Sequence, residues 1–314
     1  MYDKLTLWLG RECYNNVFPS FTQDLVDAKT SEYHQTGKRS ILGSFGNFKV
    51  NVSDDGILMN GSLAKFFYDG SNVLTLDKET ASQAIEKLCD ATGLDINQAK
   101  VTSLEFGDNF FMRRNVSAYF SILGDLDRMT RLLTAKSTLT YKSKRKELVF
   151  YDKIAEAKAK KMPYSEGLSF ENLLRYELKL KKDLKSQLKE SEILVSLLAD
   201  TRIYNKLVDL YKTTYFTIRK LAGSLIYSAN EINTPSEAMD TLFASFLSEI
   251  SPEFIGGFID GLKSHPIGKN KQNLHRAKKL LYQKFTKAQS EYIIDANVLA
   301  KELDDCIRNC VAYW

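Results

Sequence analysis

The stretch LLRYELKL, residues 173–180, indicates the fold class because its polar and apolar side chains alternate. Successive side chains of an extended strand point to opposite faces, so Arg175, Glu177 and Lys179 share one face. Tyr176 and its leucine neighbours form a continuous apolar face on the other side. A strand of this kind is typical of an antiparallel sheet that is packed on one side. We therefore expect Tyr176 in the core and Glu177 on the uncovered face.

Two further stretches have the same two-faced pattern. In VTSLEFGD, residues 101–108, Glu105 lies opposite an apolar face. In LVFYDK, residues 148–153, we expect Tyr151 and Lys153 to share one face of the strand. Three strands therefore each combine a packing face with a face that carries an ionisable group.

The rest of the chain completes an α+β pattern. Residues 46–62 read as a hairpin around an Asp-Asp-Gly turn, and a helix is expected from Asp77 or Thr80 to Gly93. Interleaved strands and helices favour a central antiparallel sheet with flanking helices. We expect this domain over residues 1–200, followed by an all-helical part over 201–314. No internal repeat is visible in the sequence.

The net positive charge of the chain is small, but it is concentrated in one region. The chain of 314 residues has a formal charge of +5, but residues 136–185 hold 14 Lys or Arg against 7 Asp or Glu. Basic runs with interleaved tyrosines suit a nucleic-acid groove, although solvated helix faces give the same pattern. The predicted DNA-binding residues are Lys142, Lys144, Arg145, Lys146, Arg175, Lys179, Lys181 and Lys182.

Several other classes of protein are disfavoured by composition. The four cysteines are scattered and read as reduced thiols, and Cys306 and Cys310 share a helix face without zinc-knuckle spacing. The three histidines form no paired metal motif, and no phosphate-binding glycine loop is present. Neither a signal peptide nor an apolar stretch of membrane-spanning length is found. We expect a cytoplasmic protein with no membrane partner.

The ionisable strand residues suggest a reactive site. A carboxylate within a strand is costly unless it is paired, solvated or bound to a metal, and several carboxylates on one sheet face would suit Mg²⁺ or Mn²⁺. A tyrosine beside such a site is a plausible nucleophile, because a cation lowers the pKa of the phenol, and Lys153 would stabilise the charge that develops. The alternative is that Tyr151 only packs and that Glu177 belongs to a surface ladder of ion pairs.

The order of four stretches resembles a known family. NGSLAKFFYDGSNVLTLDKETASQAIEKL, KVTSLEFGDNF, ELVFYDKIAE and LLRYELKLKK are similar in order and spacing to phage and plasmid replication initiation proteins, over residues 43–215. This family includes the replication endonucleases of filamentous phages and related rolling-circle initiators. Its Tyr-x-Lys-x-x-Glu pattern falls on Tyr151, Lys153 and Glu156. Its Arg-aromatic-Glu pattern falls on residues 175–177, whereas its Arg-Ile-Asp reads Ser-Leu-Glu here, ending at Glu105.

The resemblance implies an activity and a set of roles. Tyr151 would attack a DNA phosphate, with Lys153 assisting, keep the 5′ end as a phosphotyrosine and free a 3′-OH for a polymerase. Glu105, Glu156 and Glu177 would hold Mg²⁺ or Mn²⁺. The expected function is a metal-dependent, origin-specific DNA nickase and strand transferase that starts rolling-circle replication on a single-stranded or hairpin origin.

Some alternatives stay open at this stage. A host helicase or polymerase and a dimeric state are compatible with the expected function. A second tyrosine, Tyr204 or Tyr211, a water molecule or a second subunit would resolve the covalent intermediate, although these helical tyrosines also fit a packing stripe. The chain could instead be an origin-binding replication regulator without chemistry, or an RNA-binding or structural protein.

Overall fold

The computed structural model describes the chain in ten segments, which form two compact units. The described residues are 1–15, 18–32, 37–135, 137–160, 172–221, 225–226, 234–239, 252–265, 269–287 and 294–310. The first unit comprises residues 1–120, 124–219 and 304–314, and the second comprises 121–123 and 220–303.

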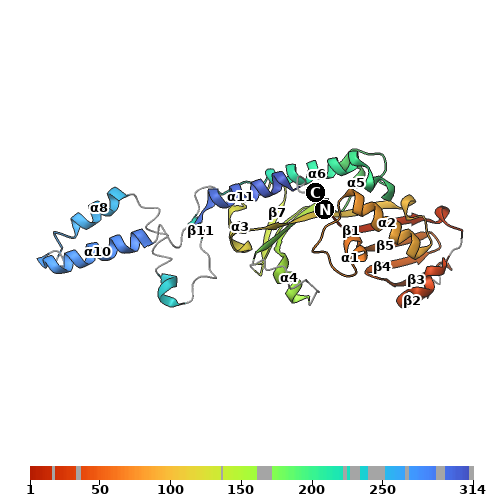
Figure 1. Cartoon of the computed structure of the whole chain (residues 1–314), viewed down its shortest axis with the longest axis horizontal. Helices are drawn as coiled ribbons and strands as arrows, with labels where there is room; N and C mark the ends of the chain where they lie inside the picture. Colours follow the sequence, from red (N-terminus) through yellow and green to blue (C-terminus); the bar gives the residue numbers. More distant parts are fainter. Residues whose placement is uncertain are drawn as a thin grey trace. The chain divides into compact units, whose positions relative to one another are not determined.

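The first unit is built on a ten-stranded antiparallel sheet in the order β2-β3-β4-β5-β1-β6-β10-β9-β8-β7 (Figure 1). This sheet with its flanking helices confirms the expected α+β class. The strands are β1 (Tyr2–Gly10), β2 (Val26–Glu32), β3 (Arg39–Phe45), β4 (Phe48–Ser53), β5 (Gly56–Ser62), β6 (Lys100–Phe111), β7 (Thr130–Thr134), β8 (Thr138–Lys142), β9 (Lys146–Asp152) and β10 (Leu173–Leu180).

The helices of this part of the chain begin and end where local chemistry dictates. Asp77 caps α2 by accepting hydrogen bonds from the backbone N–H groups of Glu79 and Thr80, and Gly93 ends the helix in the left-handed conformation, as expected from the sequence. The helices are α1 (Leu63–Phe67), α2 (Lys78–Thr92), α3 (Val116–Ile122), α4 (Lys153–Ala159), α5 (Leu184–Leu188) and α6 (Thr201–Phe216).

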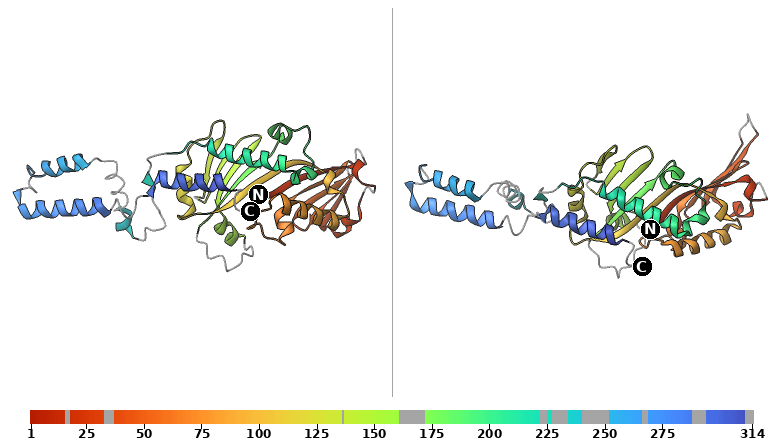
Figure 2. Two further views of the ribbon diagram at one scale, coloured as in Figure 1. Left: turned by 45° about the horizontal axis from the view of Figure 1, so that its top comes forward. Right: turned by 90° about the horizontal axis from the view of Figure 1, so that it is seen from above.

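Helices cover one face of the sheet, and the described segments leave the other face open. Helices α2 and α6 lie on the covered face (Figures 1 and 2). The ring of Tyr176 stacks between Phe150 and Tyr211, with centroid distances of 4.4 and 4.3 Å. Tyr176 is fully buried, so the prediction that it belongs to the core is confirmed. The side chains of opposite parity, including Tyr151 and Glu177, therefore emerge on the open face.

The sheet is an internal structural repeat that the sequence did not reveal. Each half has a central strand, β1 or β6, followed by a four-stranded meander that returns to it from the edge, and each half is then covered by α2 or α6. The two halves are related by an approximate two-fold axis, and each residue of β1 corresponds to the residue 99 positions later in β6. The pairing of β1 with β6 obeys this relation: Leu7 and Val101 correspond to Phe106 and Tyr2, which also pair. Leu5 pairs with Leu104, its own equivalent, so this pair lies on the axis.

The second unit contains short described segments that are mainly helical. These are the two-stranded pair β11 (Leu225–Ile226) and β12 (Ile294–Asp295), helices α8 (Pro252–Gly261) and α10 (Lys271–Lys287), and α11 (Ala296–Asn309), whose last residues belong to the first unit. Residues 240–251, part of an expected helix, lie outside the described segments. The boundary between residues 200 and 201 stays a prediction. Among the described helices, none is long and apolar enough to cross a membrane.

Tyr211→Ala should destabilise the protein strongly, because the side chain is fully buried against Tyr176 and its hydroxyl donates to the carbonyl oxygen of Tyr176. We expect a loss of about 3–5 kcal/mol in the free energy of unfolding, measured by denaturant titration. Asn205→Ala, on the exposed side of the same helix, is the control and should stay within about 0.5 kcal/mol of wild type. Equal stabilities for the two variants would show that α6 is not part of the core.

Candidate active site

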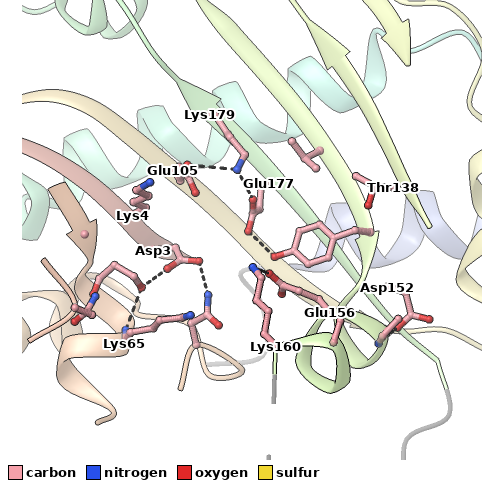
Figure 3. Close-up of a pocket in the computed structure, with 18 of the residues that line it drawn as sticks. Asp3, Lys4, Lys65, Glu105, Thr138, Asp152, Glu156, Lys160, Glu177 and Lys179 are labelled. Atoms are coloured by element: carbon pink, nitrogen blue, oxygen red, sulfur yellow. Dashed lines mark hydrogen bonds and ion pairs between the residues drawn. The ribbon is translucent and has the colours of Figure 1, made fainter. Parts of the chain in front are cut away.

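An open pocket of about 720 Å³ lies on the uncovered face, where β1, β6, β10 and β9 run side by side (Figure 3). Helices α1 and α4 close its rim with Lys65 and Glu156. Tyr151, Glu177 and Glu105 all line this pocket. The structure therefore brings the predicted nucleophile and the predicted metal ligands to one place.

Arg175 is the centre of the network beneath the pocket. It is 0% exposed, and its Nη2 and Nε each lie 2.6 Å from a carboxylate, that of Asp3 and that of Glu177 respectively. Its Nη1 donates to Asn109 Oδ1 at 3.2 Å and to the carbonyl oxygen of Asn72 at 3.3 Å. Burial alone would lower the pKa of this guanidinium, but the two carboxylates raise it well above its usual value. Arg175 is thus a buried positioning group and is not available to contact DNA.

The hydroxyl group of Tyr151 faces the pocket, and its proton takes part in a hydrogen bond. The Oη donates to Glu177 Oε1 at 2.9 Å. Burial raises the pKa of the phenol well above its usual value; Arg175 partly opposes this, and Glu177 and Glu156 raise the pKa further. The phenol is therefore protonated at neutral pH, and any attack by its oxygen needs an acceptor for that proton.

Lys179 lies between the two carboxylates of the neighbouring strands. Its Nζ is 3.0 Å from Glu177 Oε2 and 3.3 Å from Glu105 Oε1 (Figure 3). Burial would raise the pKa of Glu177, but Arg175 and Lys179 outweigh it and lower that pKa to about 2. In Glu105, burial is dominant and raises the pKa despite Lys179. Glu177 is therefore firmly ionised, and Glu105 is the more readily protonated of the two.

Lys153 does not continue the strand as expected from the sequence. Strand β9 ends at Asp152, which caps α4 by accepting from the N–H groups of Ile154 and Ala155. Lys153 is consequently the first residue of the helix, with its side chain only 1% exposed. Its ammonium lies 5.8 Å from the centroid of the Tyr151 ring.

The partners of Lys153 explain how it is held there. Its Nζ donates to Asn72 Oδ1 and to Glu156 Oε2, both at 2.8 Å. Glu156 also accepts from Lys160 at 2.5 Å. Burial would raise the pKa of Glu156, but these two lysines lower it. Glu156 thus faces the pocket as an ion-paired carboxylate.

The three predicted metal ligands fit a divalent cation in chemistry and only in part in arrangement. All are hard oxygen donors that face one pocket, which suits Mg²⁺ or Mn²⁺. Glu105 and Glu177 share Lys179, so its ammonium occupies the place between them, whereas Glu156 is held by Lys153 and Lys160. Within the described segments, no group of three or more His, Cys, Asp or Glu is close enough to hold a metal ion.

Most of the predicted DNA-binding cations lie away from Tyr151. Tyr151 is near the end of β9, and the basic cluster surrounds the start of that strand, the β8–β9 turn and the end of β10. Part of the cluster lines a separate pocket of about 660 Å³ together with Arg128. The cluster consists of Lys142, Lys144, Arg145, Lys146, Lys181 and Lys182.

The two helical tyrosines proposed to resolve an intermediate belong to the core. Tyr211 is fully buried, and its hydroxyl donates to the carbonyl oxygen of Tyr176. Tyr204 is 7% exposed and packs against Tyr2 and Phe106 on the covered face. Neither reaches the pocket, so the packing interpretation of these tyrosines is confirmed and their role as a second nucleophile is not supported by this arrangement.

Sequence reasoning missed the groups that support Arg175. Asp3 and Arg175 are 172 residues apart, and Asn72 is in a loop without regular periodicity. The only local indication that Asp3 has a special role is that it is the single acidic residue in the mainly apolar stretch MYDKLTLWL. Its partner could not be identified without the strand order.

The comparison with known families gives a direct result. A family model for the N-terminal part of a phage replication-associated protein, named Phage_CRI, matches residues 1–205. The chain belongs to this family. It is a phage replication-associated protein with a role in replication initiation, which confirms the resemblance noted over residues 43–215. The match covers all ten strands of the sheet and every side chain of the Arg175 network.

The other comparisons add little. No curated protein matches the chain. Among solved structures, the chain is similar to a protein described as the di-domain ARO/CYC StfQ from the steffimycin biosynthetic pathway, at 10% identity and a TM-score of 0.24, over 69% of this chain and 95% of that one. A TM-score this low carries no argument about fold or function.

The stability contributed by Glu177 should depend on pH in a defined direction. Its folded pKa of about 2 lies below the ordinary 4.5, so its contribution is fully present above about pH 5 and is lost as the pH falls towards 2. This contribution amounts to about 3 kcal/mol. We expect the difference in unfolding free energy between wild type and Glu177→Gln to shrink over that range. Glu86→Gln, on the exposed side of α2, is the control, and a pH-independent difference for Glu177→Gln would contradict the assignment.

Proposed function

We propose that this replication protein is an origin-specific, metal-dependent DNA nickase and strand transferase that starts rolling-circle replication of a phage or plasmid. One observation carries the proposal: the Tyr151 hydroxyl faces an open pocket and is hydrogen-bonded to a carboxylate that a buried arginine holds in place. This pairing of a nucleophile with an oriented acceptor is the arrangement that covalent catalysis needs. The family supports a replication role but does not by itself specify this chemistry.

The proposed reaction is a displacement at a DNA phosphate. The Tyr151 oxygen forms a bond to phosphorus while the bond from phosphorus to the 3′-oxygen breaks, which leaves a 5′-phosphotyrosine and a free 3′ end. The phenol proton passes to Glu177 Oε1, with which it is already hydrogen-bonded. The departing 3′-oxygen takes a proton from water, because the pocket is open and the nearby ammonium of Lys153 is buried.

The proton transfer from Tyr151 to Glu177 is uphill in the absence of further positive charge. The pKa of the phenol is raised, whereas that of Glu177 is lowered to about 2. A bound Mg²⁺ or Mn²⁺ would supply charge that lowers the pKa of the phenol and polarises the phosphodiester. In our proposal Glu105, Glu156 and Glu177, which all line the pocket, would be the residues that hold this ion.

Lys153 acts from beneath the ring in this scheme. With 1% of its side chain exposed, its ammonium is positioned to stabilise the developing charge through space and not by contact with DNA. It also orients Glu156 through their 2.8 Å hydrogen bond. Lys153 is therefore proposed as a positioning residue for the carboxylate and the phenol.

The partners in this proposal are DNA and the replication machinery. The substrate is a single-stranded or hairpin origin, and the freed 3′ end would be extended by a host polymerase with a helicase. Because Tyr204 and Tyr211 lie in the core, water or a second subunit would resolve the phosphotyrosine.

A non-catalytic origin-binding regulator is the second candidate. The ion-paired state of every predicted ligand favours it, since no three carboxylates come together among the described residues. This candidate predicts origin binding without metal-dependent cleavage.

Tyr151→Phe should abolish a covalent protein–DNA product. Single-stranded oligonucleotides that tile the DNA flanking the gene would be incubated with the protein and Mn²⁺ and resolved on a denaturing gel. We expect a shifted band with wild type that vanishes in Tyr151→Phe and with chelator. Tyr68→Phe is the matched control and should retain the band. An adduct that persists in Tyr151→Phe would identify another nucleophile, and no adduct on any oligonucleotide would favour the regulator.

Glu105→Gln should weaken binding of Mn²⁺, because it removes one of two adjacent carboxylates. The affinity for Mn²⁺ can be measured without DNA by electron paramagnetic resonance, because the signal of free Mn²⁺ decreases when the ion binds to the protein. We expect at least about a tenfold loss of affinity. Glu147→Gln, an ion-paired carboxylate elsewhere on the same sheet face, should not change it. Equal Mn²⁺ affinity in wild type and Glu105→Gln would remove Glu105 from the site.

A further inference from the structure

We infer that the open face of the first half of the sheet, β1 and β3–β5, is a non-catalytic binding surface for single-stranded DNA that continues from the Tyr151 pocket. This inference rests on the proposed function for the identity of the ligand. It adds a site outside the basic residues that the sequence singled out.

The internal repeat identifies what this half has in place of the reactive groups. Thr6 pairs with Asn60 in the first half as Glu105 pairs with Lys179 in the second, and the correspondence continues outward along the strand registers. The equivalent residues, first half then second half, are Thr6 and Glu105, Asn60 and Lys179, Leu58 and Glu177, Gly56 and Arg175, and Ser53 and Tyr151.

The first half therefore has the same scaffold without the chemistry. The nucleophile, its acceptor carboxylate and the buried guanidinium are all replaced by small, apolar or neutral groups. Strands β1, β3, β4 and β5 together contain a single carboxylate, Asp3, and that group is bound by Arg175. Because its one carboxylate is neutralised by Arg175, this surface can bind a polyanion with little charge repulsion.

The cations of this half are available to a ligand, unlike those of the other half. Lys4 and Lys49 both line the large pocket and are exposed. Neither forms a salt bridge within the described part of the chain, whereas Lys153, Lys179 and Arg175 are all ion-paired. The pocket is thus asymmetric, with ion-paired side chains around Tyr151 and, among the described residues, two lysines without a salt bridge on the side of the first half.

A row of partly exposed apolar side chains follows these lysines on the same face. Leu42 pairs with Asn51, Asn51 with Leu58 and Leu58 with Trp8, so the four lie across β3, β4, β5 and β1. Leu42 is 47% and Leu58 36% exposed. An indole and aliphatic side chains beside lysines suit unpaired bases and their phosphates, which is the mode of single-strand binding.

The shared pocket indicates the path of a bound DNA strand from Tyr151 across the first half of the sheet. Lys4, Lys49 and Asn60 of the first half and Tyr151 and Glu177 of the second line one cavity. A DNA strand whose scissile phosphate contacts Tyr151 would place phosphates several nucleotides away at Lys4 and Lys49, because these lysines lie three and five β-strands from Tyr151, and its bases over Leu58 and Trp8. The first half would thereby hold the strand that the second half cuts.

The affinity test compares two double variants in a Tyr151→Phe background with chelator, so that no cleavage occurs. The probe is a fluorescein-labelled (dT)₂₀ oligonucleotide, followed by anisotropy at several salt concentrations. Lys4→Ala/Lys49→Ala should weaken binding at least about tenfold and reduce the salt slope by about 1.4, because two phosphate contacts are lost. Lys78→Ala/Lys87→Ala removes the same charge from α2, on the covered face, and should change neither.

A second measurement tests the base-binding row without changing it. The chain has two tryptophans, Trp8 and Trp314, so in Trp314→Phe the indole fluorescence reports Trp8 alone. We expect quenching by (dT)₂₀ and little change with a duplex of equal length. Unchanged fluorescence, equal responses to single strand and duplex, or equal losses in the two double variants would each overturn the inference. The adduct assay with Tyr151 present is independent, so failure to nick with these binding effects intact would refute only the nickase.

Discussion

The architecture of the site depends on one buried guanidinium. Arg175 has no exposed surface, and an unpaired charge in that position would be strongly destabilising. It is stabilised by Asp3 from β1 and Glu177 from its own strand, each at 2.6 Å. These contacts orient Glu177 so that one oxygen also accepts from Tyr151. The position of the proposed nucleophile is therefore a consequence of a charge balance that extends from β1 through β10 to β9.

The repeated sheet separates scaffold from chemistry. Both halves follow the same order of strands and have a covering helix, α2 or α6, so the packing demands on each apolar face are the same. Only the second half has ionisable groups at the positions equivalent to Ser53, Gly56 and Leu58. We propose that this asymmetry makes one half the reactive one and leaves the other to bind the strand, so that one phosphate is presented to one tyrosine.

Much of this could be predicted from strand alternation, and the failures have physical reasons. Alternation placed Tyr176 in the core and Tyr151, Glu105 and Glu177 on one open face, because a strand has only two faces. It failed for Lys153, since Asp152 ends the strand by capping a helix, and this turned the lysine into a buried group. The part played by Asp3 and the repeat itself depend on which strands are neighbours, and single-strand patterns do not contain that information.

The role of Tyr151 as nucleophile is tested by identifying the residue that becomes linked to DNA. The wild-type adduct formed with Mn²⁺ would be digested with nuclease and trypsin and mapped by mass spectrometry. Trypsin cleaves after Lys146 and Lys153, so we predict a nucleotide mass on the peptide ELVFYDK, with fragmentation placing it on Tyr151. A nucleotide on any other tyrosine-containing peptide, with ELVFYDK unmodified, would contradict this role.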